Sequence, residues 1–248
     1  MRLFAIIGAL ALAALACNTL LPPRPPLEWN PDPTNLVVQA SSSGGMLPDP
    51  NNVPGARLWG DGRLVWAEFD SSGGRLVQTR TLTPDEMRAL LQRIENDGFF
   101  GWKDQYSPGQ VFDAPSTCVT VWLTSQSKST CEILSGAPAG FERLYADLAS
   151  GAGQAGNDLA PERGYFSVMS LGPAAGAGSG PVTDWPGEAL GLPLDQALGG
   201  VWIEGAALQA AWQAVNANSL YPLLREGDTL YTARLLAPGV TLADPPEP

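Results

Sequence analysis

The counts of cysteine and histidine limit the chemistry available to this chain. The sequence of 248 residues contains three cysteines, Cys17, Cys118 and Cys131, and no histidine. Without histidine there is no Ser-His-Asp or Cys-His catalytic arrangement and no zinc site with imidazole ligands. The candidates for chemistry are therefore the thiols, the carboxylates and the two lysines, Lys103 and Lys128.

Cys17 stands directly behind an uncharged segment. Residues 3–16 carry no charge, and a helix of these 14 residues would rise only ~21 Å, less than the ~30 Å hydrocarbon core of a bilayer. The length of this segment and the residues beside it indicate that residues 1–16 are a signal peptide and not a membrane-spanning helix. The sequence Ala-Leu-Ala-Cys at 14–17 resembles a bacterial lipobox, in which a diacylglycerol is joined to the cysteine by a thioether and the chain is cleaved before it. We therefore expect a lipid on Cys17. An ordinary secreted protein and an uncleaved anchor are the alternatives.

The segment after Cys17 has the composition of a spacer. Residues 17–33 contain six prolines and no helical or alternating apolar pattern. Such a stretch is typical of an extended, semi-rigid tether. The combination predicts an exported protein that is held by its lipid on the extracytoplasmic side of a bacterial cell membrane.

Cys118 and Cys131 flank a predicted hairpin over residues 117–134. If Thr124 and Ser125 form the centre of its turn, the two cysteines lie directly opposite each other on one face, close enough for a disulfide. Export to an oxidising compartment favours that bond. A four-residue turn from Ser125 to Lys128 would break the pairing. Two free thiols, or redox catalysis, are the other possibilities.

The carboxylates and lysines offer weaker candidates for catalysis. Asp104 and Asp113 share one predicted loop, and two carboxylates could act as an acid/base pair or as ligands of a hard cation. The simpler interpretation is a turn made by Asp113 and a solvated Asp104. Lys128 lies among serines on an exposed hairpin tip, where nothing would lower its pKa for Ser-Lys catalysis. We therefore predict no catalytic residue, no metal and no cofactor.

Tryptophan supplies the best candidates for binding. The chain has eight tryptophans, and Trp29, Trp102 and Trp185 fall in predicted loops. Exposed aromatic side chains could stack on sugars or anchor a protein partner. The alternative is that they cover apolar core beneath the loops. The formal net charge of −11 argues against binding to nucleic acid.

The order of the expected elements predicts an α+β fold, namely an antiparallel meander with one capped amphipathic helix packed on it, and a smaller α+β segment. The helix should begin after Thr83, which with Glu86 forms a capping box, and end at Gly98. The expected organisation is a signal peptide at 1–16, a tether at 17–33, an α+β domain at 34–150, a linker at 151–164, a smaller α+β segment packed on the first at 165–242, and a disordered acidic tail at 243–248.

Several short motifs along the chain resemble those of uncharacterised exported bacterial lipoproteins. They are Gly44-Gly45-Met46, Gly60-Asp61-Gly62-Arg63, Leu82-Thr83-Pro84, Gly98-Phe99-Phe100, the run Asp-Ala-Pro-Ser-Thr at 113–117, and the late strand at 231–239. The resemblance implies location and architecture and carries no activity or site with it.

The function predicted from these observations is a lipid-anchored envelope protein that binds another envelope component, a protein or a glycan, without catalysis. The competing hypothesis is a carboxylate-based hydrolase that acts on envelope glycans. An enzyme should have paired carboxylates in a cleft, whereas a binding module should expose an aromatic patch.

Overall fold

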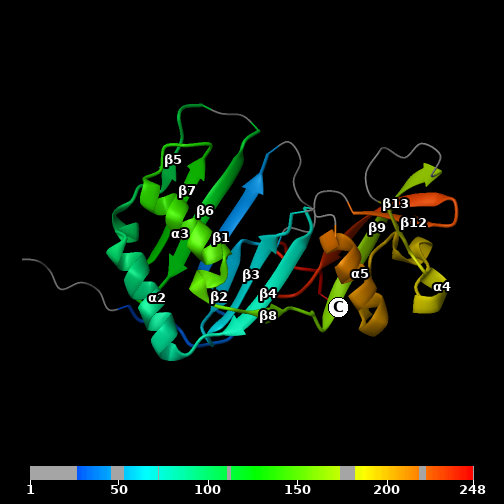
Figure 1. Cartoon of the computed structure of the whole chain (residues 1–248), viewed down its shortest axis with the longest axis horizontal. Coiled ribbons are helices and arrows are strands. Elements are labelled where there is room, and N and C mark those ends of the chain that lie inside the picture. The colour runs from blue at the N-terminus through cyan, green and yellow to red at the C-terminus, as the bar shows by residue number, and fades with distance from the viewer. Residues whose placement is uncertain are drawn as a thin grey trace, which may run out of the picture.

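The computed structural model describes residues 27–45, 53–71, 73–110, 113–173, 182–217 and 222–247. Within these residues the chain forms two mostly antiparallel sheets, one of eight strands and one of five, with helices on them. The two sheets lie side by side along the longest axis of the molecule (Figure 1). This arrangement confirms the predicted α+β fold. We call the parts built on these sheets the large unit and the small unit.

The sheet of the large unit has the strand order β5-β7-β6-β1-β2-β3-β4-β8. All neighbours are antiparallel except β5 and β7, which run parallel. The strands are β1 Leu36–Gly44, β2 Ala56–Trp59, β3 Arg63–Phe69, β4 Arg75–Thr81, β5 Gln105–Tyr106, β6 Pro115–Trp122, β7 Ser127–Ile133 and β8 Asn157–Asp158.

The turn between β2 and β3 forms at the Gly-Asp-Gly sequence that predicted it. Gly62 has a φ of 89°, which glycine adopts without strain, and its N–H donates to the carbonyl oxygen of Trp59 at 3.0 Å. The side chain of Asp61 accepts from the N–H of Arg63 at 3.0 Å. The next hairpin joins β3, which ends at Phe69, to β4, which begins at Arg75.

Two helices cover one face of the large sheet, α2 Pro84–Asn96 and α3 Ala139–Ala149 (Figure 1). Each presents apolar residues at helical spacing to the sheet. Short 3-10 turns follow both helices, η1 Phe99–Gly101 and η2 Gly151–Gly153. The shared core contains Met87, Leu90, Leu91 and Ile94 of α2, Phe141, Leu144 and Leu148 of α3, and Leu58, Leu64, Trp66, Val119 and Val121 of the sheet.

The sheet of the small unit has the order β10-β12-β13-β9-β11, in which β10 and β12 are parallel and the other pairs antiparallel. Helix α5 buries Leu208, Ala211 and Val215 in the core of this unit. The elements are β9 Arg163–Pro173, β10 Val182–Asp184, α4 Gly187–Leu190, η4 Leu194–Ala197, β11 Val201–Glu204, α5 Gly205–Ala217, β12 Leu223–Glu226 and β13 Thr229–Leu236.

A third hydrophobic cluster joins the two units on the face of the large sheet opposite α2 and α3. Trp59, Val65 and Val77 of that sheet pack with Ala237 and Val240, which follow β13. The buried guanidinium of Arg57 donates to the carbonyl oxygen of Thr241 at 2.7 Å. The small unit therefore packs on the large one.

The predicted linker at 151–164 contains ordered structure. It includes η2 and the short edge strand β8, which pairs with Gln78 and Thr79 of β4. Of the predicted disordered tail, the structure describes residues 243–247, which contain no helix or strand, and the disorder itself stays a prediction.

Candidate functional site

The expected disulfide between Cys118 and Cys131 is present. The two cysteines are paired directly across β6 and β7, with their Cα atoms 4.1 Å apart. The turn occupies residues 123–126, where the N–H of Leu123 donates to the carbonyl oxygen of Gln126 at 2.8 Å. This is the register centred on Thr124 and Ser125. The four-residue turn from Ser125 to Lys128 does not form, since Lys128 lies within β7 opposite Val121.

Cys17 lies outside the described residues. Its lipidation, the signal peptide and most of the tether therefore stay predictions. The described chain begins at Leu27, which packs with Trp29 against the core of the large unit.

Trp29 and Trp102 are half-buried and cover the core of the large unit. The indole N–H of Trp29 donates to the carbonyl oxygen of Gly60 at 3.1 Å. Trp102 contacts Phe99 and Phe141 edge to face, with ring centroids 5.6 and 6.2 Å apart. Each side chain thus has a packing role that accounts for its place in the fold.

Trp185 is buried, which fits the alternative that the tryptophans cover apolar core, and its role as a contact residue stays a prediction. Its side chain is only 5% exposed and stacks on Phe166 with centroids 5.4 Å apart. Its indole N–H donates to the carbonyl oxygen of Leu192 at 2.8 Å. Trp185 therefore belongs to the core of the small unit, whereas Trp29 and Trp102 belong to that of the large one, and the three do not form one aromatic surface.

The two candidate carboxylates, Asp104 and Asp113, lie in different local environments. Asp104 makes an ion pair with Lys128, and Asp113 is an exposed residue with a left-handed backbone at φ 57°. In the described parts of the chain, no group of three or more cysteine, aspartate or glutamate side chains is placed to hold a metal ion.

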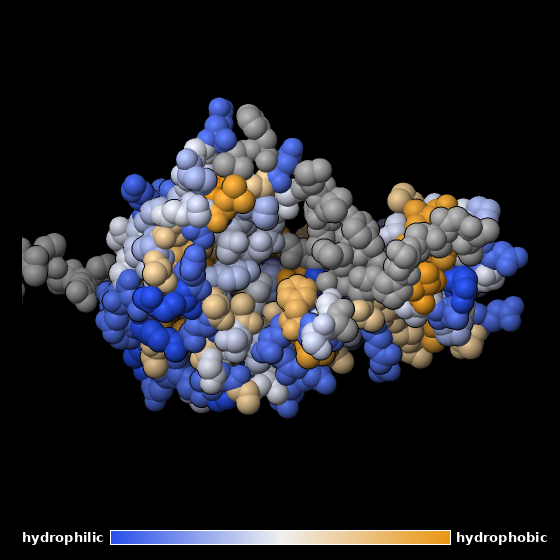
Figure 2. Space-filling model, turned by 45° about the horizontal axis from the view of Figure 1, so that its top comes forward, coloured by the Kyte–Doolittle hydropathy of each residue, from blue (hydrophilic) through white to orange (hydrophobic). Residues whose placement is uncertain are grey.

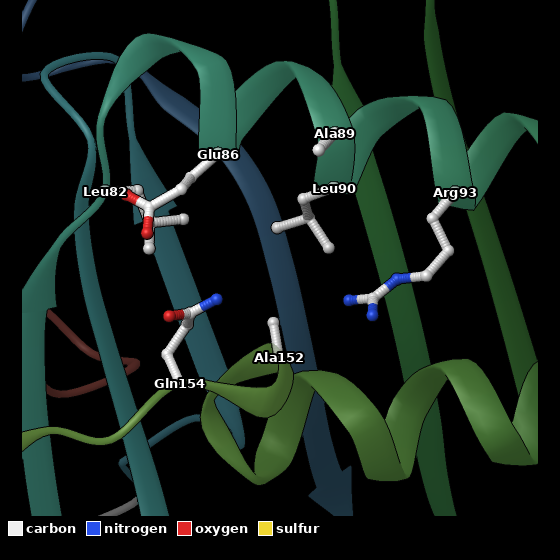
Figure 3. A pocket seen from close by; sticks show the side chains of 7 residues that line it. All are labelled: Leu82, Glu86, Ala89, Leu90, Arg93, Ala152 and Gln154. Carbon is white, nitrogen blue, oxygen red and sulfur yellow. The ribbon is translucent and has the colours of Figure 1, made fainter.

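One cavity of about 290 Å³ is a groove between α2 and the chain after α3 (Figure 3). Figure 3 shows Glu86 and Arg93 of α2 on one side and Gln154 on the other. Both charged groups already have partners, since Glu86 pairs with Arg80 and Arg93 with Asp147, each at 2.6 Å. Hydrogen bonds from the backbone and hydroxyl of Thr83 lower the pKa of Glu86, so this carboxylate is committed to capping α2.

A larger cavity of about 430 Å³ lies where the two units meet, and we call it the cleft. It lies next to the short pairing of β8 with β4, which the N–H of Leu159 extends by donating to the carbonyl oxygen of Val77 at 2.8 Å. Residues 75–77 of β4 line one side of the cavity and α5 lines the other. The cleft is lined by Asp70, Gly74, Arg75, Leu76 and Val77 of the large unit, by Asp158, Leu159 and Ala160 of the connecting chain, and by Gln209, Trp212, Gln213, Asn216 and Ala217 of α5.

The wall formed by α5 is a row of carboxamides. Gln209, Gln213 and Asn216 are spaced by four and three residues and so lie on one face of the helix. Trp212 fixes this face, because its indole N–H donates to the carbonyl oxygen of Leu159 at 3.1 Å. The glutamines are exposed, whereas Asn216 is only 7% exposed.

Asn216 carries a buried polar atom without a partner. Its Nδ2 donates to the carbonyl oxygen of Trp212 at 2.9 Å, but its Oδ1 accepts no hydrogen bond. An unsatisfied buried acceptor costs about 1–3 kcal/mol, and such groups are rare in native proteins. This oxygen is itself buried, so the wall behind the exposed glutamines contains an acceptor that the fold leaves unpaired.

The opposite wall carries charge next to apolar surface. The Arg75 side chain is 5% exposed and lies over the ring of Phe69, 5.7 Å from its centroid. Asp70 accepts from the N–H of Gly74 at 2.9 Å, and Asp158 accepts from Nε2 of Gln78 at 2.5 Å. The side chain of Leu76 is 49% exposed beside them.

The interpretation of the sequence missed this site. No prediction from the sequence placed Gln209, Gln213 or Asn216 in a site. The signal was present in the spacing of the three carboxamides around Trp212, but the opposite wall comes from β4, more than a hundred residues earlier. Only the packing of the two units brings the walls together.

Comparison of the chain with protein-family models, with curated proteins and with solved structures finds no significant match. Among the described residues, no helix is both long and apolar enough to cross a membrane. Figure 2 shows that the face of the molecule displayed there is largely hydrophilic, with separate hydrophobic areas over both units.

Proposed function

We propose that this chain is an exported, lipid-anchored binding protein of a bacterial envelope, with its ligand site in the cleft between the two units. The observation that carries the proposal is the cleft itself, a cavity between two units whose lining includes the exposed carboxamides of Gln209 and Gln213. Ligand pockets occur preferentially at such boundaries between units.

The disulfide supports the exported location. Disulfides persist in oxidising compartments outside the cytoplasm, and Cys118 and Cys131 are joined across two paired strands of the large sheet. Together with the uncharged segment at 3–16 and the lipobox-like sequence that ends at Cys17, the bond favours a chain that folds after export.

The position of the described N-terminal residues supports attachment of the folded part to the membrane through its N-terminus. The chain enters the fold at Leu27 on the large unit, at the end of the long axis opposite the small unit (Figure 1). A lipid on Cys17, followed by the proline-rich tether, would hold this end nearest the membrane. The cleft would then lie part-way along the molecule, open to envelope components.

A hydrolase remains the second candidate, because Asp70 and Asp158 line the same cleft. Both carboxylates accept hydrogen bonds from the chain itself. General acid/base catalysis on a glycan needs carboxyl groups that can exchange protons with the substrate. Turnover of a bound glycan that is lost in Asp158→Asn would favour the hydrolase over the binding protein.

The anchor is tested with the full chain expressed in a bacterium that has a lipoprotein export pathway. We expect wild type to partition into the detergent phase with an acylated N-terminus, and Cys17→Ser to appear in the aqueous phase, because thioether-linked acyl chains give stable attachment. Asn18→Ser, which keeps the cysteine, is the matched control and should behave as wild type. Retention of Cys17→Ser in the detergent phase would contradict the proposal.

A further inference from the structure

We infer that the cleft binds a neutral, hydroxyl-rich ligand of one or two sugar rings. The inference rests on the proposed function, since it names the ligand class of the same cleft. It depends on the carboxamides of α5, on the apolar side chains between them and on the charge balance of the lining.

The carboxamides match hydroxyl groups. Each glutamine offers two N–H donors and a carbonyl acceptor, and a hydroxyl both donates and accepts, so neighbouring hydroxyls can pair with both ends of an amide. The residues Gln209 and Asn216 are seven positions apart, which in a helix corresponds to a rise of about 10 Å. A ligand that lies along α5 could therefore meet the exposed carboxamides of Gln209 and Gln213, which lie within that length.

The third carboxamide lies behind the other two. Asn216 lines the cleft but is only 7% exposed, its Nδ2 donates to the carbonyl oxygen of Trp212, and its Oδ1 is buried. The carboxamides that a ligand meets first are therefore those of Gln209 and Gln213, which are exposed.

The remaining lining suits the carbon face of a sugar ring. Leu76, Val77 and Trp212 provide apolar surface between the polar groups. The volume of about 430 Å³ lies within the range of ~300–1,000 Å³ that is usual for small-molecule sites.

Charge disfavours an anionic ligand. The lining contains the carboxylates of Asp70 and Asp158 and a single guanidinium, that of Arg75, and the chain as a whole has a formal net charge of −11. A phosphate or an acidic sugar would meet a negative surface. A neutral saccharide meets no such repulsion.

The experiment measures binding by titration calorimetry, with the detergent-solubilised full chain and three neutral probes: N,N′-diacetylchitobiose, cellobiose and maltose. We expect at least one to bind with a dissociation constant of millimolar or better. Removal of two hydrogen-bonding side chains in the double variant Gln209→Ala/Gln213→Ala should weaken that binding about tenfold or more. Both glutamines are exposed, so the variant should keep its melting temperature.

Two further variants locate the site. Asn216→Leu removes the buried acceptor and should also weaken binding, with its melting temperature measured alongside because it loses the bond to Trp212. The matched control is Gln154→Ala, which removes a carboxamide from the groove of Figure 3 and should leave the affinity unchanged.

Three results would overturn the inference. They are the absence of millimolar binding to all three probes, binding that the double variant leaves unchanged, and tighter binding of glucuronic acid than of the neutral probes. The test is separate from that of the anchor, because Cys17→Ser should bind the probes as wild type does. Loss of the anchor with binding intact would contradict only the proposed location.

Discussion

At the scale of single residues, two glycines after α3 allow the backbone to pack closely against Trp66 because they have no side chain. A Cβ on Gly156 would lie 2.2 Å from Cη2 of Trp66, and one on Gly151 would lie 2.6 Å from the same indole ring. Trp66 is 1% exposed and central to the core of the large unit. The glycine-rich composition of this stretch suggested a flexible boundary, yet these two glycines let the backbone pass directly over a buried indole.

We predict that Gly156→Ala destabilises the protein by about 1–3 kcal/mol, the usual cost of overpacking a well-packed core. Urea unfolding followed by tryptophan fluorescence would measure the change in the free energy of unfolding. Gly199→Ala is the matched control, because a Cβ there would have nothing within 4 Å. Equal stability of the two variants would show that Trp66 can move aside.

The sequence predicted some residue contacts well and others poorly. Strict alternation in two strands placed Cys118 opposite Cys131 for a turn centred on Thr124 and Ser125, and this is the turn that forms. The burial of Trp185 could not be predicted in the same way, since it depends on Leu192 and Phe166, which come from separate elements. Local patterns determine the first contact, whereas tertiary packing determines the second.

At the scale of elements, the start of α2 follows directly from its sequence. The Thr83 hydroxyl accepts from the N–H of Glu86 at 3.3 Å, and the Glu86 carboxylate accepts from the N–H of Thr83 at 2.8 Å. This is the reciprocal capping box that the sequence predicted.

We predict that Thr83→Ala lowers the free energy of unfolding by about 1 kcal/mol through loss of the cap. Thr81→Ala, at an exposed threonine just before the helix, is the control and should have a smaller effect. The capping box also makes stability depend on pH. Since the hydrogen bonds lower the pKa of Glu86 in the folded state, its contribution is present above the unfolded pKa and is lost as the pH falls through the folded one.

The variant Glu86→Gln should therefore lose less stability than wild type when the pH is lowered from 7 to below about 4. Urea titrations at both pH values measure this difference. An identical acid dependence in the two proteins would mean that Glu86 does not stabilise the helix through its charge.

The sequence predicted that the capped helix forms, but it did not predict the strand at the edge of the large sheet. The capped helix lies where its sequence placed it, with Thr83 as the cap and Gly98 just past its end. Strand β8 is only two residues long, and neither Asn157 nor Asp158 favours a strand on its own. It forms because β4 offers an edge, which the chain follows as far as the hydrogen bond from the N–H of Leu159 to the carbonyl oxygen of Val77.

At the scale of the whole molecule, the two units share a core that no local pattern predicts. Trp59 and Val65 of the large unit pack with Val240, which follows the last strand of the small unit. The carbonyl oxygen of Thr241 accepts from the buried Arg57 guanidinium. This packing brings α5 opposite β4, so the ligand site follows from the arrangement of the units rather than from either one alone.

The central claim is that this is an exported, lipid-anchored protein whose folded part contains a disulfide between Cys118 and Cys131. The most direct test is mass spectrometry of peptides from the protein isolated from bacterial membranes without reducing agent. We predict an N-terminal peptide that begins at Cys17 and carries acyl chains, together with a peptide in which Cys118 is linked to Cys131. A chain that begins at Met1, with all three cysteines as free thiols, would contradict the account.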